Sequence, residues 1–245
     1  VAMTSSTSMI FNLMVQYEKD FIDIIKPLDG SFVVYPRGIW VSEMFAFCAL
    51  CKHFGVEKII ESGIYLGQST DIITSFLSDT NLYSIDKEIK QEVKSRYERR
   101  NGKWFLEGNG ETWVSYIIDT SSRDLCLAVL LDGPKGDAAL NLALRCLRGN
   151  NNVKFVAIHD VYSPSAARVL MDDTFCSKWY TDDPEFVERY KYMDEGKYDR
   201  WMDERGYGKK PYTLIRPEGT TKIQSYGPTL GFLFREDLIG KIEIS

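Results

Sequence analysis

The sequence predicts a doubly wound α/β fold with a mostly parallel sheet, and three observations support this prediction. Between residues 58 and 160, short apolar segments alternate with segments of helical periodicity. Two apolar segments, residues 125–131 and 155–158, are nearly free of polar residues, as expected for central parallel strands covered on both faces. A turn with two glycines follows the first apolar segment. Ligands bind beyond the carboxyl ends of such strands, so we expect a site near this turn.

Each expected element follows from the local pattern. The strands are expected at residues 58–62, 81–86, 103–107, 125–132 and 153–160. The helices between them are expected at residues 69–78, 87–100, 111–120 and 137–148. Apolar residues at helical spacing predict two earlier helices, at residues 9–25 and 40–54. Residues 212–216 and 229–235 predict a closing hairpin at the edge of the sheet.

Length and composition indicate a globular protein that can bury a sizeable core. The chain has 245 residues, of which 44% are hydrophobic and 27% are charged. Because no linker or repeat is visible, we expect one domain, with a helical extension at residues 1–55 packed on an α/β region at residues 56–245. The net charge of -5 argues against a broad nucleic-acid surface. No apolar run approaches the ~18 residues of a membrane span, so we expect no membrane partner.

The cysteines indicate a reducing environment. Their number is odd, five in a chain of this size, so a disulfide framework is not expected. Cys48 and Cys51 form a CxxC pair that could be redox-active or bind a metal. They lie inside an apolar helical run, however, which favours buried thiols. With no signal peptide visible at the first residues, we expect a cytoplasmic protein.

The spacing of the two glycines discriminates between cofactors. A dinucleotide turn has the pattern G-x-G-x-x-G, whereas here Gly63 and Gly67 are separated by three residues and Glu61 precedes them. An acid suits a cationic ligand end rather than a pyrophosphate. Asp86, one strand–helix–strand unit later, is placed to bind ribose hydroxyls, although it could also cap the following helix. A ligand with ribose and an amino-acid tail, S-adenosylmethionine, therefore fits better than NAD.

Other acids follow the remaining strands. Asn109 lies in the acid-bearing turn after the third strand, Asp132 and Lys135 follow the fourth, and His159 and Asp160 end the fifth. Unpaired carboxylates are rarely placed against a core for packing alone. A line of them along one sheet edge therefore predicts a site.

The segment Glu61-Ser-Gly-Ile-Tyr-Leu-Gly-Gln-Ser69 resembles the first motif of class I S-adenosylmethionine-dependent methyltransferases, and residues 82–86 resemble the second. The resemblance covers roughly residues 56–162 and implies a Rossmann-like fold and methyl transfer. It implies that Gly63 and Gly67 line the methionine part of the cofactor and that Glu61 orients the end of the methionine. Asp86 would hold the ribose, and Asn109 or its neighbours would contact the adenine. Tyr65 and Ser69, which belong to the first motif, and Asp132 complete the implied cofactor-binding residues.

The Asp132-Gly-Pro-Lys135 cluster is similar to the arrangement in catechol-type, metal-dependent O-methyltransferases. That similarity implies that Asp132 and Asp160 bind Mg²⁺ or another divalent cation and that Lys135 is the general base. His159 departs from it, since a histidine suits Mn²⁺, Fe²⁺ or Zn²⁺ better than Mg²⁺. The catalytic set is then Asp132, Lys135, His159 and Asp160, with Lys135 or His159 removing a proton from the acceptor.

Structural interpretations of the same residues stay open. Asp132 could stabilise only its own turn, Lys135 could be a solvated lysine, and His159 could be a buried histidine bonded to a carbonyl group. Metal dependence is as well supported as its absence. Asp160 beside Asp132 would nevertheless need a cation or a proton between them.

The expected partner is a small polar acceptor molecule that is methylated on oxygen. Three alternatives remain. One is an NAD-dependent enzyme, and another is a non-catalytic interaction module on the same fold. The third is an RNA or protein methyltransferase, for which the basic residues between 94 and 103 are the candidate surface, although acids interrupt them. The sequence leaves open whether the chain forms a homo-oligomer.

Residues 163–211 are expected to form an insertion after the fifth strand. Its charged residues and aromatic residues suit either a helical segment packed on the domain or a lid over the site. As a lid, it would bring aromatic side chains over the acceptor: Tyr198, Trp201 and Tyr207.

Overall fold

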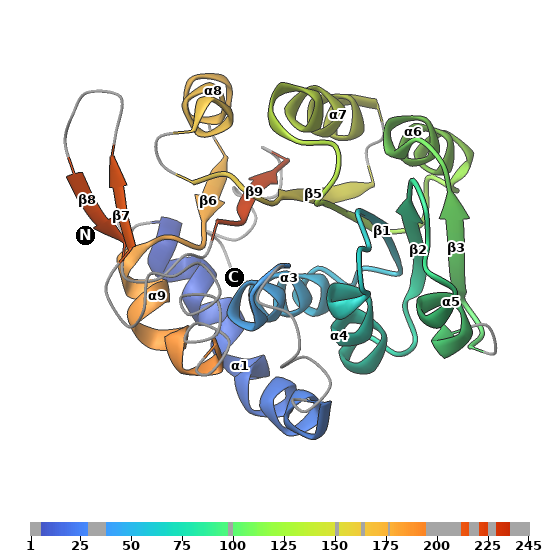
Figure 1. Ribbon diagram of the computed structural model, residues 1–245, viewed down its shortest axis with the longest axis horizontal. Helices are drawn as coiled ribbons and strands as arrows, with labels where there is room; N and C mark the ends of the chain where they lie inside the picture. The colour runs from blue at the N-terminus through green and yellow to red at the C-terminus, as the bar shows by residue number, and fades with distance from the viewer. Residues whose placement is uncertain are drawn as a thin grey trace.

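The computed structural model describes residues 6–28, 38–97, 100–149, 152–162, 165–175, 177–194, 212–215, 221–224 and 229–235. These residues form a seven-stranded sheet in the order β3-β2-β1-β4-β5-β9-β6, with helices on both faces (Figure 1). The predicted doubly wound, mostly parallel α/β fold is confirmed. None of the described helices is long and apolar enough to cross a membrane.

Five parallel strands form the part of the sheet that carries the strand-end residues. They are β1 (Lys58–Ser62), β2 (Asn81–Asp86), β3 (Lys103–Glu107), β4 (Leu127–Leu131) and β5 (Val153–Ile158). The first three have the predicted bounds, whereas β4 and β5 end before Asp132 and His159. The last aligned pair of these strands is Leu131 with Ile158, so the charged residues that follow are in the loops beyond the ladder.

The predicted edge hairpin is wrong. Strand β9 (Gly231–Phe234) lies inside the sheet, antiparallel to both β5 and the edge strand β6 (Lys178–Tyr180). All four residues of β9 are buried, as suits a strand with neighbours on both sides and helices on both faces. The other predicted hairpin segment, β7 (Tyr212–Ile215), pairs with β8 (Thr221–Gln224) in a separate two-stranded sheet.

Two groups of helices cover the sheet (Figure 1). One face carries α1 (Ser6–Ile25), α3 (Val41–His53), α4 (Gln68–Phe76), α5 (Gln91–Tyr97) and α9 (Pro184–Tyr190), with the short helices η1 (Lys26–Leu28) and η2 (Lys191–Asp194). The other face carries α6 (Gly110–Thr120), α7 (Gly136–Gly149) and α8 (Ala166–Thr174). The helices expected at residues 9–25, 40–54, 69–78, 111–120 and 137–148 are found, and none of their ends shifts by more than three residues.

Helix α5 is shorter than the expected residues 87–100. It begins at Gln91. In the segment before it, the Lys87 amide donates to Asp86 and the Ile89 amide donates to Glu107, which fixes this segment against the ends of β2 and β3.

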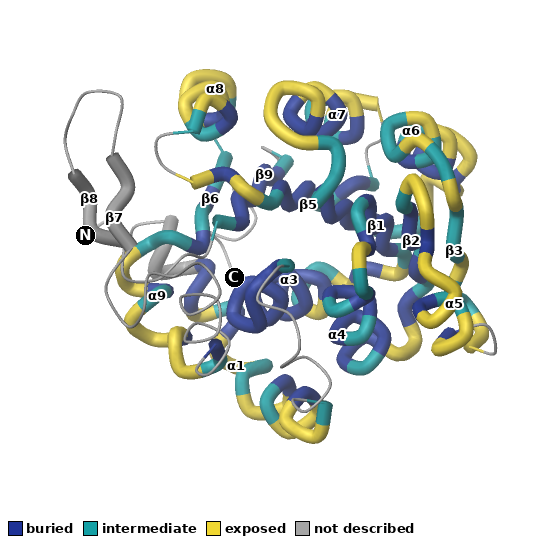
Figure 2. The backbone as a smooth tube through the Cα atoms, viewed as in Figure 1, coloured by how far each residue is buried: buried dark blue, intermediate teal, exposed yellow. Residues whose placement is uncertain are grey.

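The sheet separates the two large clusters of the core, because successive side chains of a strand point to opposite faces, and a third, small cluster lies at α5. In β1, Ile59 joins the cluster beneath α1, α3 and α4, whereas Ile60 joins the cluster beneath α6 and α7. Helix α3 is buried along almost its whole length, between α1 and the sheet (Figure 2). A helix buried all round places any polar residue it carries inside the protein.

The buried-thiol interpretation of the CxxC pair is confirmed. Cys48 and Cys51 lie in α3 and are fully buried, and both are free thiols. Burial raises the pKa of each thiol, which makes them poor nucleophiles and poor metal ligands.

A substitution at Phe155 tests the packing of the core between the sheet and α3. The side chain is fully buried in β5, with its ring centroid 5.5 Å from that of Phe47 and 5.8 Å from that of Phe232. Phe155→Ala should lower the free energy of unfolding by about 3–5 kcal/mol, because the cavity cannot close. The control Val169→Ala, at a residue 51% exposed, should change it by less than about 0.5 kcal/mol. Urea unfolding measures both, and equal losses would contradict this packing.

Candidate functional site

Gly63 places the turn after β1 directly against the end of β4. Its φ is 99°, a conformation that favours glycine. A Cβ atom at this position would come within 2.9 Å of the backbone of Asp132 and of Gly133. The amides of Asp132 and Gly133 both donate to the Ser62 carbonyl, at 2.7 and 2.9 Å. The glycine therefore lets the two strand ends meet.

Asp86 holds the same turn from its other side. Its Oδ2 accepts from the amides of Ile64 and Tyr65, at 2.8 and 3.0 Å, and its Oδ1 accepts from the Lys87 amide at 2.7 Å. The residue is thus bonded to the turn and does not cap α5. Tyr65 has a φ of 51° and is 49% exposed, which places its ring at the surface of the turn. The glycine turn therefore lies between the side chain of Asp86 and the backbone of Asp132.

Gly67 is the N-cap residue just before α4, and both its backbone conformation and the space around it favour glycine. Its φ is 82°, and a Cβ atom would lie 3.0 Å from a guanidinium nitrogen of Arg96. Arg96 pairs with Asp71 and donates to the Leu66 carbonyl, both at 2.5 Å. These two contacts stabilise the turn against α4. The first intrahelical bond runs from the Asp71 amide to the Gly67 carbonyl. Helix geometry leaves the amides of Ser69 and Thr70 to receive a polar or anionic group.

Glu61 is fully buried rather than exposed to the turn. Its carboxylate accepts from the hydroxyl of Ser69, and from those of Thr70 and Ser84 at 2.7 Å each. Burial raises its pKa, and the three hydroxyl bonds oppose this shift. Glu61 and Ser69 therefore form one unit that ties β1 to α4, and the carboxylate can influence a ligand only through its hydroxyl partners.

Asn109 is the N-cap of α6, with its side-chain oxygen accepting from the Thr112 amide at 3.0 Å. This bond satisfies one of the free donors at the start of the helix. The predicted adenine contact at Asn109 thus lies at the end of β3, and two strands, β2 and β1, separate β3 from the strand β4 that precedes Asp132.

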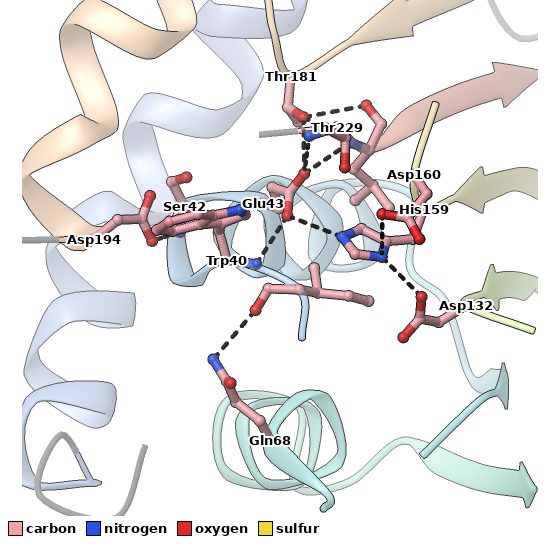
Figure 3. A network of polar contacts seen from close by, with 12 residues as sticks. Trp40, Ser42, Glu43, Gln68, Asp132, His159, Asp160, Thr181, Asp194 and Thr229 are labelled. Carbon is pink, nitrogen blue, oxygen red and sulfur yellow. Dashed lines mark hydrogen bonds and ion pairs between the residues drawn. The ribbon is translucent and has the colours of Figure 1, made fainter. Parts of the chain in front are cut away.

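The predicted catalytic residues lie together beyond β4 and β5. Lys135 bridges the two acids, bonded to Asp132 and, at 2.7 Å, to Asp160. The Nδ1 atom of His159 lies 2.7 Å from Asp132 (Figure 3). Asp160 has a φ of 64°, so its backbone turns sharply after β5 and brings its side chain back toward Lys135. The cation expected between the two acids is supplied by the chain itself.

Glu43 is a member of this charged cluster that the sequence analysis missed. It comes from α3, and its Oε2 lies 3.6 Å from Nε2 of His159 (Figure 3). The sequence contains a signal that could have identified it, namely an acid inside a largely apolar helix. Because a buried carboxylate needs a charged or hydrogen-bonded partner, such an acid predicts a polar contact inside the protein.

The charges of the cluster shift the pKa values of its members. Burial lowers the pKa of His159, but Asp132 and Glu43 outweigh this and raise it to about 10. Burial likewise opposes a charge on Lys135, yet the two aspartates raise its pKa above the ordinary value. Burial would raise the pKa of Asp132, but His159 and Lys135 lower it. Lys135 and His159 are therefore both protonated at neutral pH, and neither is a ready base in this arrangement.

The same cluster offers a set of metal ligands. One ligand atom from each of Asp132, His159 and Asp160 lies within 4.8 Å of the others. Two carboxylate oxygens and one imidazole nitrogen suit Mn²⁺, Fe²⁺ or Zn²⁺ better than Mg²⁺. The ring must lose a proton to bind a cation, so metal binding and the present ion pairs compete.

The aromatic residues proposed for the lid, Tyr198, Trp201 and Tyr207, lie outside the described residues, as does most of the segment after residue 194. Residues 165–175 and 177–194 of the expected insertion form α8, β6, α9 and η2. This part packs as ordinary secondary structure, with β6 at the edge of the main sheet.

A scan against models of protein families finds no match, and neither does a search of curated proteins. Among solved structures, the SAH-bound methyltransferase PaMTH1 of Podospora anserina is 13% identical with a TM-score of 0.42, over 91% of this chain and 88% of that chain. An O-methyltransferase of Bacillus cereus in complex with SAH is 13% identical with a TM-score of 0.44, over 88% and 91%. Both of these proteins are methyltransferases. At these identities and TM-scores the likeness assigns no activity to this chain.

His159 should titrate far above an ordinary histidine. Its folded pKa of about 10 lies above the ordinary 6.5, so its charge contributes stability that is complete below about pH 6.5 and is lost as pH rises through about 10. The ring-nitrogen resonances in a chelator-treated sample measure this. His53, whose pKa burial lowers, is the internal reference, and His53→Gln assigns the two signals. A His159 titration near pH 6.5 would contradict the ion-pair arrangement.

Proposed function

We propose that this chain is a class I S-adenosylmethionine-dependent methyltransferase that methylates an oxygen of a small polar acceptor. One observation carries the proposal: the Gly63 turn is bonded to Asp86 at one end and lies against Asp132 at the other. A ligand lying across this turn would meet a carboxylate suited to ribose on one side and a charged cluster on the other. This is the order in which the nucleoside and the reactive sulfur follow each other in the cofactor.

The residues around the turn fit the cofactor. A carboxylate has about four lone-pair positions, and Asp86 uses three of them on backbone amides, so one stays available for a ribose hydroxyl. The amides of Ser69 and Thr70 at the start of α4 would receive the cofactor carboxylate. Glu61 would act through Ser69, by holding its hydroxyl in place.

The charge of the cluster suits a cationic sulfur. Glu43, Asp132 and Asp160 are three acids, whereas Lys135 and His159 are two basic groups, so acids are in excess. A sulfonium ion beside Asp132 would be attracted by this excess. Transfer of its methyl group is an in-line displacement, in which alignment of the two reactants supplies much of the acceleration.

The acceptor would lie over Lys135 and Asp160, the most exposed members of the cluster, with side chains 49% and 52% exposed. An ammonium group and a carboxylate side by side can orient a hydroxyl group as acceptor and donor. Lys135 can take a proton only when its two carboxylate partners are neutralised, because both hold its pKa up. A divalent cation held by Asp132, His159 and Asp160 would lower the pKa of a hydroxyl bound to it.

Calorimetry with S-adenosylmethionine tests the cofactor. Wild-type protein should bind it and should bind NAD poorly. Asp86→Ala should weaken binding by about 10- to 100-fold, because it removes the ribose acceptor and releases the turn. The control Asp119→Ala, at an exposed acid of α6, should leave the affinity unchanged. Tight binding of NAD without binding of S-adenosylmethionine would overturn the proposal.

Calorimetry with Mn²⁺, in two buffers of different ionisation enthalpy, tests the cation. Binding should release a proton, because His159 is protonated before it can act as a ligand. Asp160→Asn should weaken Mn²⁺ binding, whereas Asp173→Asn, at an exposed acid of α8, should not. If wild-type protein binds no Mn²⁺, the metal part of the proposal is wrong, and the methyl-transfer part is judged by the cofactor alone.

A further inference from the structure

Glu43 is a buried acid whose contacts reach beyond its own helix. It is fully buried at the third position of α3, and its Oε2 accepts from the Trp40 amide at 2.8 Å, which caps the helix. Its Oε1 accepts from the amides of Thr229 and, at 2.7 Å, of Leu230, just before β9. The Thr181 hydroxyl donates to the same oxygen at 3.3 Å. Capping α3 needs only one oxygen, so helix capping does not account for the second set of contacts.

The oxygen that caps α3 also faces the site. Oε2 lies 3.6 Å from Nε2 of His159, while Asp132 lies 2.7 Å from Nδ1 of the same ring. The His159 side chain is 9% exposed, so this pairing is little screened by water. The ring is thus held at both nitrogens by carboxylates from two different layers of the fold (Figure 3).

We propose that Glu43 is a positioning residue of the site, which fixes the orientation of the His159 ring and, through it, the carboxylate of Asp132. This inference rests on the proposed function, since it assigns Glu43 to the methyl-transfer site. Without Glu43, the ring would keep partners only at Nδ1, where Asp132 lies at 2.7 Å and Asp160 at 3.6 Å. Nε2 would have lost its carboxylate, so the ring could rotate about its Cβ–Cγ bond and carry Nδ1 away from Asp132. The Asp132 carboxylate would then be held by Lys135 alone among these side chains.

Glu43 also fixes one wall of the site. The amide of Val161, one residue beyond Asp160, donates to the Thr229 carbonyl at 2.8 Å, while the Thr229 amide donates to Glu43. Residue 229 is therefore held between the loop after β5 and helix α3. A single carboxylate thus sets both the histidine ring and the chain segment that lies beside Asp160.

The ring-nitrogen resonances of His159 test this role without an acceptor. Glu43→Gln keeps the size of the side chain but replaces one accepting oxygen with an amide donor. If its oxygen accepts from Thr229 and Leu230, its amide faces His159. The Nε2 resonance of His159 should then shift clearly. S-adenosylmethionine should still bind, with a smaller loss of affinity than in Asp86→Ala, because Asp86 and the glycine turn are untouched. The chain has two histidines, so the signals are readily assigned.

Thr181→Val is the matched control, since it removes one donor to the same carboxylate, on the oxygen that does not face His159. A merely structural role for Glu43 predicts that both variants lower stability and that neither moves the His159 resonances more than the other. Our proposal predicts a large shift only in Glu43→Gln. Unfolding midpoints of both variants show whether stability differs.

The outcomes separate the two proposals. If wild-type protein does not bind S-adenosylmethionine, the proposed function fails, and with it the assignment of Glu43 to a methyl-transfer site. If it binds and Glu43→Gln leaves the His159 resonances in place, the positioning role fails alone. Should Glu43→Gln not fold, wild-type protein decides: the proton on Nε2 should exchange slowly with water because it faces a buried carboxylate, and fast exchange would overturn the role.

Discussion

The His159 imidazole, held between the carboxylates of Asp132 and Glu43, joins the two layers from which the site is built. Glu43 comes from a helix buried on all sides and Asp132 from the end of a central strand. A buried carboxylate is costly without a charged or hydrogen-bonded partner, and the ring gives Glu43 a cationic partner and Asp132 a second one beside Lys135. The orientation of the residues beyond β4 and β5 therefore depends on how α3 packs against the sheet.

The turn after β1 connects this arrangement to Asp86, the residue proposed to bind the ribose. A side chain at residue 63 would collide with the backbone at Asp132, so the turn is packed closely against the end of β4. The position of the turn therefore depends on the position of that strand end. Asp86 fixes the other side of the turn through backbone amides rather than through a side chain. Asp86 and the charged cluster are thus parts of one connected structure, with the glycine turn between them.

The sequence predicted the parts of this structure that depend on local pattern. Strand β1, with Glu61 near its end and Gly63 behind it, was predicted with its bounds because alternation, acid and glycine follow each other in the chain. The position of β9 was missed because antiparallel insertion between β5 and β6 depends on distant segments. Glu43 was missed for the same reason, since it lies 186 residues from Thr229. The protonated state of Lys135 also depends on contacts across the site and could not be predicted from spacing.

A crystal structure of the protein with S-adenosylhomocysteine tests the central claim most directly, because it shows where the nucleoside and the sulfur lie relative to the turn. The account predicts a ribose hydroxyl within hydrogen-bonding distance of Asp86 and the sulfur on the Asp132 side of Gly63. A nucleoside bound away from Asp86, or a sulfur remote from Asp132 with the turn unchanged, would contradict it.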